Sequence, residues 1–360
     1  MAHAKALPAN IGVGLAPVLV LIVLIAPVAL GLALTLLPAF GYLPVLGGER
    51  LTLSYFAQLF ATPGLAHSVM VSLMAGLLTP LIALSLVLLF LAGTAGTRLE
   101  RWMRRLVAPL LAIPHAAAAF GLAFLIAPSG LFMRLISPEL NGLSSPPDVL
   151  IVNDYWGLTM SAGLIIKEIP FLLLMALAAL PQIEPEKRVA IARSLGYRPC
   201  RAWLMTVVPA LYPLIRLPVY AVIAFASATV DVSLILGPNL PYTLSVMVLQ
   251  WFNDPDLSYR FVAAAGALLQ LGVTICALLL WRLIESLGAW LGRRWISRGE
   301  RRSGEALLRV SGQLGVGLAV LVSVGGVLAL LINSFAGFWR FPDNLPGAWT
   351  TQTWSRALAE

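Results

Sequence analysis

The sequence contains few charged residues for its length. Asp, Glu, Lys and Arg make up 11% of its 360 residues, against about 25% in a typical soluble domain. A soluble globule of this length could not cover its surface with so few charges. The shortage therefore excludes a cytosolic enzyme, a nucleic-acid-binding protein and a disordered chain.

Cysteine and histidine are also scarce, which limits the chemistry of the chain. The sequence has two cysteines, Cys200 and Cys276, and three histidines, His3, His67 and His115. These numbers and spacings predict neither a disulfide framework nor a metal site, and no cofactor is expected. The sequence lacks a G-x-x-x-x-G-K-S/T motif and a supported catalytic triad. It is therefore not expected to be an enzyme or to carry its own ATPase site.

Long apolar runs take the place of the missing charge. Hydrophobic residues make up 59% of the chain, and the mean hydropathy is +0.90. A helix needs about 20 apolar residues to cross a bilayer, and seven runs qualify: 11–37, 66–91, 107–126, 158–180, 211–236, 261–283 and 314–332. The runs lack the alternation of a membrane β-barrel. They predict an all-α, polytopic transmembrane bundle.

The basic residues predict the orientation of this bundle. Arginine and lysine concentrate in three connecting segments, 92–106, 181–210 and 284–313, whereas the alternate segments carry almost none. Basic loops remain on the cytoplasmic side of a membrane. The N-terminus, which carries Lys5, is therefore expected in the cytoplasm, and seven spans place the other end outside.

The segment 181–210 is unusually long for an inner loop and has helical character. Its features are basic side chains on helix-forming stretches, a turn at Gly196 and a second short helix beginning at Pro199. Proline is well tolerated at the first position of a helix. The segment is either a solvated basic loop or an amphipathic surface presented to a partner protein.

Within this segment, the sequence from 189 to 211 resembles the EAA loop of permease subunits from binding-protein-dependent ABC importers. Gly196 occupies the glycine position of that pattern, Thr206 the usual isoleucine, and Val208-Pro209 the Leu-Pro pair. Residues 190–192 replace the Glu-Ala-Ala opening. The surrounding sequence, over about 50–290, resembles the fused two-half permeases of the iron and thiamine type.

The resemblance implies the MetI-like permease fold and a set of partners in the bacterial inner membrane. Two separate ATPase subunits would bind the inner loops, a substrate-binding protein would deliver substrate outside, and lipid would surround the bundle. Six residues are expected at or near the ATPase contact: Arg193, Leu195, Gly196, Arg198, Trp203 and Pro209. The fused relatives import iron, thiamine, polyamines or oxyanions.

A weak internal repeat suggests how the chain is organised. Residues 12–16 recur at 315–319, and the segment 51–60 aligns with 349–358, pairing Thr52 with Thr350. We expect a first six-span permease half over 1–308, followed over 309–360 by the first span and outer loop of an incomplete second half. The chain would then be truncated. The alternative is a half-permease with one additional span that dimerises.

Three ionisable residues lie within the predicted spans. Lys167 and Glu168 fall in the fourth span and Asp231 in the fifth. Such residues either form structural ion pairs or line a transport path, and Lys167 is expected to pair with Asp231. His115, in the third span, is expected to be a packed polar residue. If these groups instead coupled transport to an ion gradient, the chain would be a secondary transporter. A membrane enzyme and a membrane scaffold are further alternatives.

Overall fold

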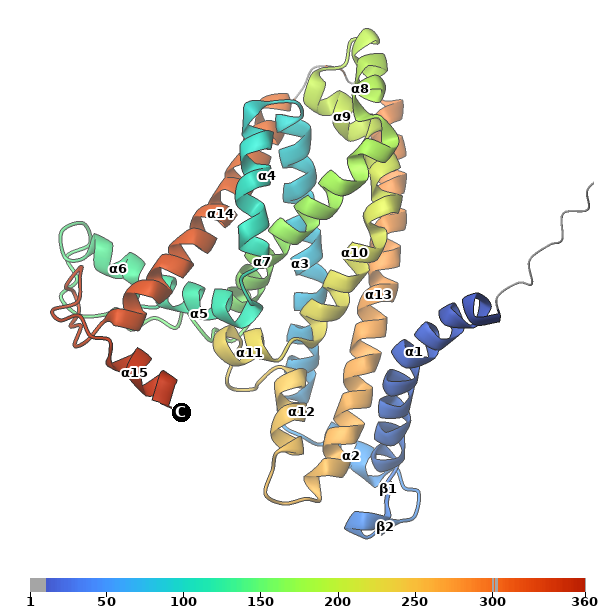
Figure 1. Cartoon of the computed structure of the whole chain (residues 1–360), viewed down its shortest axis with the longest axis vertical. Helices are drawn as coiled ribbons and strands as arrows, with labels where there is room; N and C mark the ends of the chain where they lie inside the picture. Colours follow the sequence, from blue (N-terminus) through green and yellow to red (C-terminus); the bar gives the residue numbers. More distant parts are fainter. Residues whose placement is uncertain (1–10, 300, 302–303, 360) are drawn as a thin grey trace, which may run out of the picture. The chain divides into compact units, whose positions relative to one another are not determined.

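The computed structural model describes residues 11–299, 301 and 304–359, and the side chains from residue 17 onward. Lys5 and His3 lie outside the described residues. The chain divides into two compact units. Figure 1 labels the helices and strands. Unit 1 contains the residues up to Thr62 together with Met247–Leu269, and unit 2 contains Pro63–Val246 and the residues from Gln270 onward.

The predicted all-α membrane fold is confirmed. Among the described residues, seven helices are long and apolar enough to cross a membrane. They begin and end as follows: Pro17–Ala39, Leu65–Thr94, His115–Ile136, Leu158–Ile183, Val208–Ala228, Tyr259–Ser297 and Glu305–Phe335. The sixth and seventh are considerably longer than the apolar runs, because their polar ends continue as helix.

Unit 1 contains the first helix and the segment that follows it. Helix α1 (Ile11–Ala39) leads into a two-stranded hairpin of β1 (Tyr42–Leu43) and β2 (Gly48–Glu49), with a single 3-10 turn, η1 (Pro44–Leu46), between them. Helix α2 (Ser54–Phe60) follows. Tyr55 stacks on Phe261, with ring centroids 4.6 Å apart, and this contact fastens the segment to the beginning of α13 (Tyr259–Ser297).

Unit 2 is built around one long central helix, α3 (Leu65–Thr94), which packs against α7 (Leu158–Ala179), α10 (Val208–Ala228) and α14 (Glu305–Phe335). Its remaining helices are α4 (Arg98–Leu111), α5 (His115–Ile126), α6 (Leu131–Ile136), α8 (Pro185–Ser194), α9 (Pro199–Thr206), α11 (Asp231–Leu236) and α15 (Gln352–Ala359). Helix α12 (Leu244–Phe252) and α13 continue from one unit into the other.

The third predicted span is broken, which the apolar run did not reveal. Helix α4 ends at Leu111 and α5 begins at His115, after Pro114. Proline lacks the N–H that would continue the helical ladder. The half before the break is amphipathic: Met103, Val107 and Leu110 face the core, whereas Arg101, Arg104 and Arg105 are exposed. The predicted run at 107–126 therefore joined parts of two helices.

The fifth predicted span is also interrupted. Helix α10 ends at Ala228, Thr229 is extended, and α11 begins at Asp231. Asp231 consequently begins a short helix beyond the span instead of lying inside a continuous one. Both breaks create helix ends whose backbone N–H and C=O groups lack partners within the helix. Nearby polar side chains can therefore hydrogen-bond to these backbone groups.

Candidate functional site

The loop between the fourth and fifth spans folds as the sequence predicted. Helix α8 ends at Ser194, Gly196 adopts a left-handed conformation with φ +88°, and α9 begins with Pro199 at its first turn. Glycine enters this conformation without the steric cost of a Cβ atom. The N–H of Gly196 donates to the carbonyl of Arg193 at 2.9 Å, which closes the turn between the two helices.

One side of this loop is fixed to unit 2. Cys200 and Trp203 are each 2% exposed and belong to the main hydrophobic core. A carboxylate oxygen of Glu305, at the start of α14, accepts from the backbone N–H of Cys200 at 3.1 Å, and its second oxygen lies 3.7 Å from Arg198. Trp203 thus anchors the loop to its own bundle.

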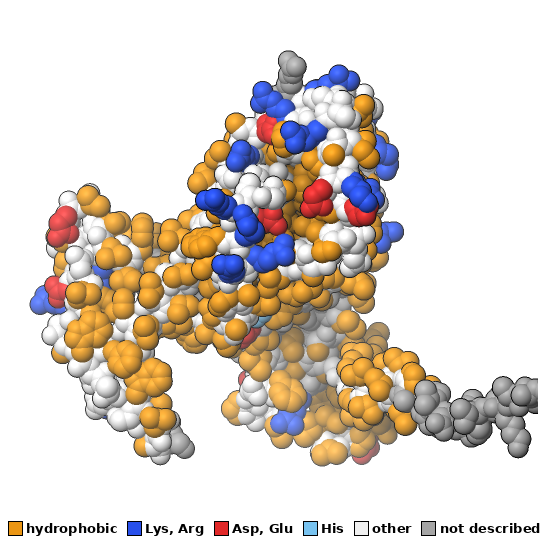
Figure 2. Space-filling model, turned by 45° about the horizontal axis from the view of Figure 1, so that its top comes forward, with side chains coloured by type: hydrophobic (Ala, Val, Ile, Leu, Met, Phe, Trp, Pro, Cys, Tyr) orange, Lys and Arg blue, Asp and Glu red, His pale blue; other side chains and the backbone are white. Residues whose placement is uncertain are grey.

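The other side of the loop is exposed and basic. Arg193, Gly196 and Arg198 are exposed, and Leu195 retains 59% of its accessible surface. Pro209, at the start of α10, is exposed as well. Figure 2 shows Lys and Arg side chains gathered over this end of unit 2, the end at which α4, α8 and α9 lie in Figure 1. The loop therefore forms a rigidly held surface suited to an acidic or amphipathic partner.

A charged network beneath the loop was missed by the sequence analysis. Glu285 of α13 accepts from the hydroxyl of Tyr212 at 2.5 Å and from two nitrogens of Arg216, at 3.0 and 2.6 Å. Arg282 adds a bond of 2.8 Å to the same carboxylate. The signal was Arg216, a lone cation inside the run 211–236, which requires a partner in a membrane. The network ties α10, which follows the loop directly, to α13.

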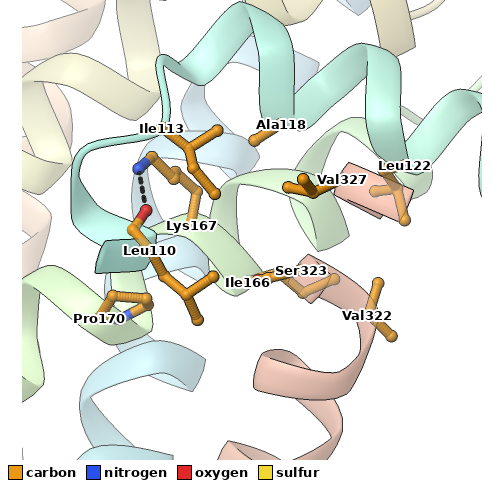
Figure 3. A pocket seen from close by; sticks show the side chains of 11 residues that line it. Leu110, Ile113, Ala118, Leu122, Ile166, Lys167, Pro170, Val322, Ser323 and Val327 are labelled. Atoms are coloured by element: carbon orange, nitrogen blue, oxygen red, sulfur yellow. Dashed lines mark hydrogen bonds between the residues drawn. The ribbon is translucent and has the colours of Figure 1, made fainter. Parts of the chain in front are cut away.

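Lys167 does not pair with Asp231, so that prediction is wrong. Its ammonium group donates to the backbone carbonyl of Leu110 at 2.9 Å (Figure 3). It also donates to the carbonyl of Leu111 at 3.1 Å. These carbonyls end α4 at the break in the third span. A cation is favoured there because the end of a helix carries partial negative charge and free carbonyl oxygens. Lys167 is 6% exposed and borders a cavity of about 20 Å³, room for roughly one water molecule.

Glu168 pairs with the histidine on the other side of the same break. Its carboxylate lies 3.2 Å from Nε2 of His115, the first residue of α5. The carboxylate side chain is 6% exposed and the histidine 34% exposed. The imidazole ring also packs on Phe225 of α10, at a centroid distance of 4.5 Å. His115 is therefore a packed polar residue, as expected, with a carboxylate partner that the sequence did not reveal.

Asp231 lies apart from this pair, beside the second break. It is exposed, and one carboxylate oxygen accepts from the hydroxyl of Thr229 at 2.8 Å. It lines an open depression together with Phe225, Thr229 and Leu234. Phe225 connects the two sites, because its ring contacts His115 and also borders this depression. The structure thus brings Glu168 and His115 together and leaves Asp231 available to a ligand or to another chain.

Comparison with known proteins gives one informative match. The chain is 30% identical over 291 residues to the inner membrane ABC transporter permease protein YnjC of Escherichia coli (strain K12). The alignment covers 78% of this chain and 52% of the relative, so the chain spans about half the length of that protein. No family model matches the sequence.

Proposed function

We propose that the chain is the membrane-spanning permease subunit of an ABC importer in the bacterial inner membrane, coupled to separate ATPase subunits through the loop 181–210. The similarity to an inner membrane ABC transporter permease and the seven membrane-capable helices support a transport subunit. The observation that carries the coupling role is the shape of the loop: two short helices around Gly196, buried on one side by Trp203 and exposed on the other.

The exposed side of the loop is proposed as the ATPase contact. Arg193, Leu195 and Arg198 lie there around the turn at Gly196. Trp203 and Glu305 fix the loop to the bundle, so movement imposed on the loop is passed to α10 instead of being absorbed by loose chain. Pro209 marks the junction at which α10 begins. By the preference of basic segments for the cytoplasmic side, the basic end of unit 2 is proposed to lie in the cytoplasm. The N-terminus, which carries Lys5, is proposed to lie on the same side on the basis of the sequence.

The polar groups at the two helix breaks are proposed to border the translocation path. Discontinuous helices are typical of substrate sites at mid-membrane, because broken helices present polar backbone there. Glu168 and Asp231 would face the path, with His115 and Phe225 between them. Lys167 would not line the path itself; it would hold the end of α4 in place through the carbonyls of Leu110 and Leu111. An extracytoplasmic substrate-binding protein would supply the substrate from the other end of the bundle.

The domain organisation belongs to the same proposal. Residues 1–308 would form a first permease half and 309–360 the start of a second, although helix α14 already begins at Glu305. A relative of about twice the aligned length favours two halves over one half with an additional span. An ion-coupled secondary transporter is not favoured, because Lys167 is engaged by backbone carbonyls and forms no switchable pair with Asp231.

The coupling role can be tested by co-purification with the ATPase subunit of the same transporter. The double variant Gly196→Asp with Arg193→Glu should lose ATPase binding. Arg101→Glu, an exposed arginine of α4 at the same end of unit 2, is the matched control for a charge change and should retain binding. Equal binding by all three proteins would overturn the loop as the contact. Absence of binding by the native chain would overturn the importer assignment.

A further inference from the structure

Helix α4 presents three arginines on its outward side, which we call the α4 arginine face: Arg98, Arg101 and Arg105. Spacings of three and four residues place them within about 60° of one another around the helix. All three side chains are exposed, and none forms an ion pair or a side-chain hydrogen bond with another described residue. The helix belongs to the end of unit 2 over which basic side chains gather (Figure 2). The face is therefore a concentration of positive charge without a counter-ion in the described part of the chain.

The acidic residue of α4, Glu100, does not neutralise this face. One of its carboxylate oxygens accepts from the backbone N–H of Gly96 at 2.8 Å, and the other accepts from Arg104 at 3.3 Å. Glu100 also lies at least about 100° around the helix from each arginine of the face. The carboxylate is thus committed to the start of the helix, and the positive charge of the face remains available to an anionic partner.

The helix that carries the face is held firmly in unit 2. Met103, Val107 and Leu110 are buried on the opposite side of α4 and belong to the main hydrophobic core. The carbonyl of Leu110 accepts from Lys167 at the end of the helix. These contacts prevent α4 from turning, so the arginines are directed outward before any partner binds. A partner consequently meets a preorganised surface.

The position of α4 along the chain sets the depth of the face in a membrane. The apolar run 107–126 begins inside α4, so the arginines are expected at the edge of the hydrocarbon layer. Arg98 and Arg105 lie about 10 Å apart along the helix axis, and the headgroup layer of one leaflet is roughly 5–7 Å deep. Long arginine side chains cover this difference by extending toward the headgroups. All three guanidinium groups can therefore reach the same headgroup layer.

An exposed tryptophan borders the arginines. Trp102 is 59% exposed and lies within about 60° of Arg98 and Arg105 around the helix. Tryptophan is enriched where membrane meets water. Exposed basic and aromatic side chains beside an apolar run are typical of a helix at a membrane surface. This combination favours lipid over an acidic protein as the partner of the face.

We propose that the α4 arginine face binds the headgroups of anionic phospholipids, with Trp102 at the boundary between headgroups and acyl chains. Guanidinium groups bind phosphate through paired N–H donors. A zwitterionic lipid offers the same phosphate but carries a compensating ammonium group, so lipids with net negative charge should be preferred. Each arginine near an anionic surface contributes about fivefold in affinity. The proposal depends on the position of α4 in the membrane and not on the function proposed above.

Fluorescence quenching by spin-labelled lipids tests the proposal on the full chain in phosphatidylcholine vesicles. A bimane probe would be attached through Ala108→Cys in a Cys276→Ala background. Ala108 is exposed and lies one turn beyond Arg105 on the same side of α4, whereas Cys200 is buried. Phosphatidylglycerol and phosphatidylcholine, each carrying a doxyl group near the top of one acyl chain, would be titrated separately. The ratio of the two quenching affinities measures the preference of the face for anionic lipid.

The unsubstituted face should prefer phosphatidylglycerol at least about tenfold, and about 1 M NaCl should remove most of this preference because the Debye length is then about 3 Å. Arg98→Gln with Arg105→Gln should lower the preference at least about fivefold. Arg98→Lys with Arg105→Lys retains both charges and should keep most of it. The matched control, Arg293→Gln with Arg298→Gln, removes two exposed arginines near the end of α13 and should leave the ratio unchanged.

Three results would overturn the proposal. The first is equal quenching by the two lipids, or a preference that the double-glutamine variant retains. The second is the absence of quenching by either lipid, since protein would then cover the face. The third is loss of ATPase binding by the double-glutamine variant, which would assign the face to the ATPase. Failure of the native chain to bind the ATPase would leave the lipid preference intact and would count only against the proposed function.

Discussion

Lys167 and Glu168 are adjacent in α7, yet they hold opposite sides of one break in the third span. The ammonium of Lys167 binds the last carbonyls of α4, and the carboxylate of Glu168 binds His115 at the start of α5. Adjacent residues on a helix point about 100° apart, which is the divergence needed to contact two separate helix ends. The pair therefore acts as a brace for the break and does not form an internal ion pair.

Replacing Lys167 with methionine should destabilise the bundle without unfolding it. The carbonyls of Leu110 and Leu111 would lose a charged donor in an apolar setting, at a cost of about 1–3 kcal/mol. Lys167→Arg should lose less stability than the methionine variant, because a guanidinium can still donate to these carbonyls. Unfolding in detergent with increasing SDS measures the difference. Equal stability of the methionine variant and the native protein would contradict the brace.

The variant Glu168→Gln distinguishes a structural role of Glu168 from a role in transport. The amide can still hydrogen-bond to His115, so the fold should remain within about 1 kcal/mol of the native protein. The negative charge is lost. If Glu168 lines the translocation path, substrate uptake should fall at least tenfold while ATPase binding persists. The measurement is uptake into proteoliposomes containing the complete transporter. Unchanged uptake would make Glu168 structural only.

The sequence predicted the membrane helices well because long apolar runs have one stable form in a bilayer. The turn at Gly196 and the helix start at Pro199 were also predictable, since both residues restrict the backbone in a known way. Pro114 offered a comparable signal for the break in the third span. The break at Thr229 offered none, because that stretch contains neither glycine nor proline.

The partners of the buried charges could not be predicted for a different reason. Lys167 binds backbone carbonyls, and such groups are present at the end of every helix, whatever the sequence. Pairing it with Asp231 required a carboxylate on a continuous fifth span, and the break at Thr229 removes that geometry. Ion pairs can therefore be assigned from sequence only where the helix ends are already known.

The carboxylate of Glu285 should be the main polar contact that stabilises the packing of α10 against α13. Glu285→Ala would remove the carboxylate that binds Arg216 and should destabilise the bundle, by less than the loss of one partner from a fully buried ion pair because Arg216 is about one-third exposed. The double variant Glu285→Met with Arg216→Met should be more stable than the sum of the single losses predicts. Additive losses in SDS unfolding would contradict a coupled network.

Gly196→Ala should strain the backbone of the loop 181–210. A residue with a Cβ atom pays about 1–2 kcal/mol in the left-handed region, and the φ of Gly196 is +88°. The added methyl meets only ordinary contacts, the nearest being the Arg301 side chain at 3.6 Å. The effect should therefore be backbone strain, and Gly196→Asn should be milder because asparagine tolerates this region. ATPase co-purification should fall in the order glycine, asparagine, alanine, and any other order would contradict the strain argument.

Cys200 should titrate at unusually high pH. Burial, followed by the negative charge of Glu305, raises the pKa of its thiol from 9.0 to about 11. Because the folded-state pKa lies above the unfolded value, the resulting stability is fully present below about pH 9 and is lost as the pH rises toward 11. In a Cys276→Ala background, iodoacetamide should alkylate the Cys200 thiol slowly at pH 8 and increasingly fast up to about pH 11. Glu305→Gln should shift that profile to lower pH, because the neutral amide removes one cause of the raised pKa. A reaction midpoint near pH 9 in both proteins would show that neither burial nor Glu305 controls the thiol.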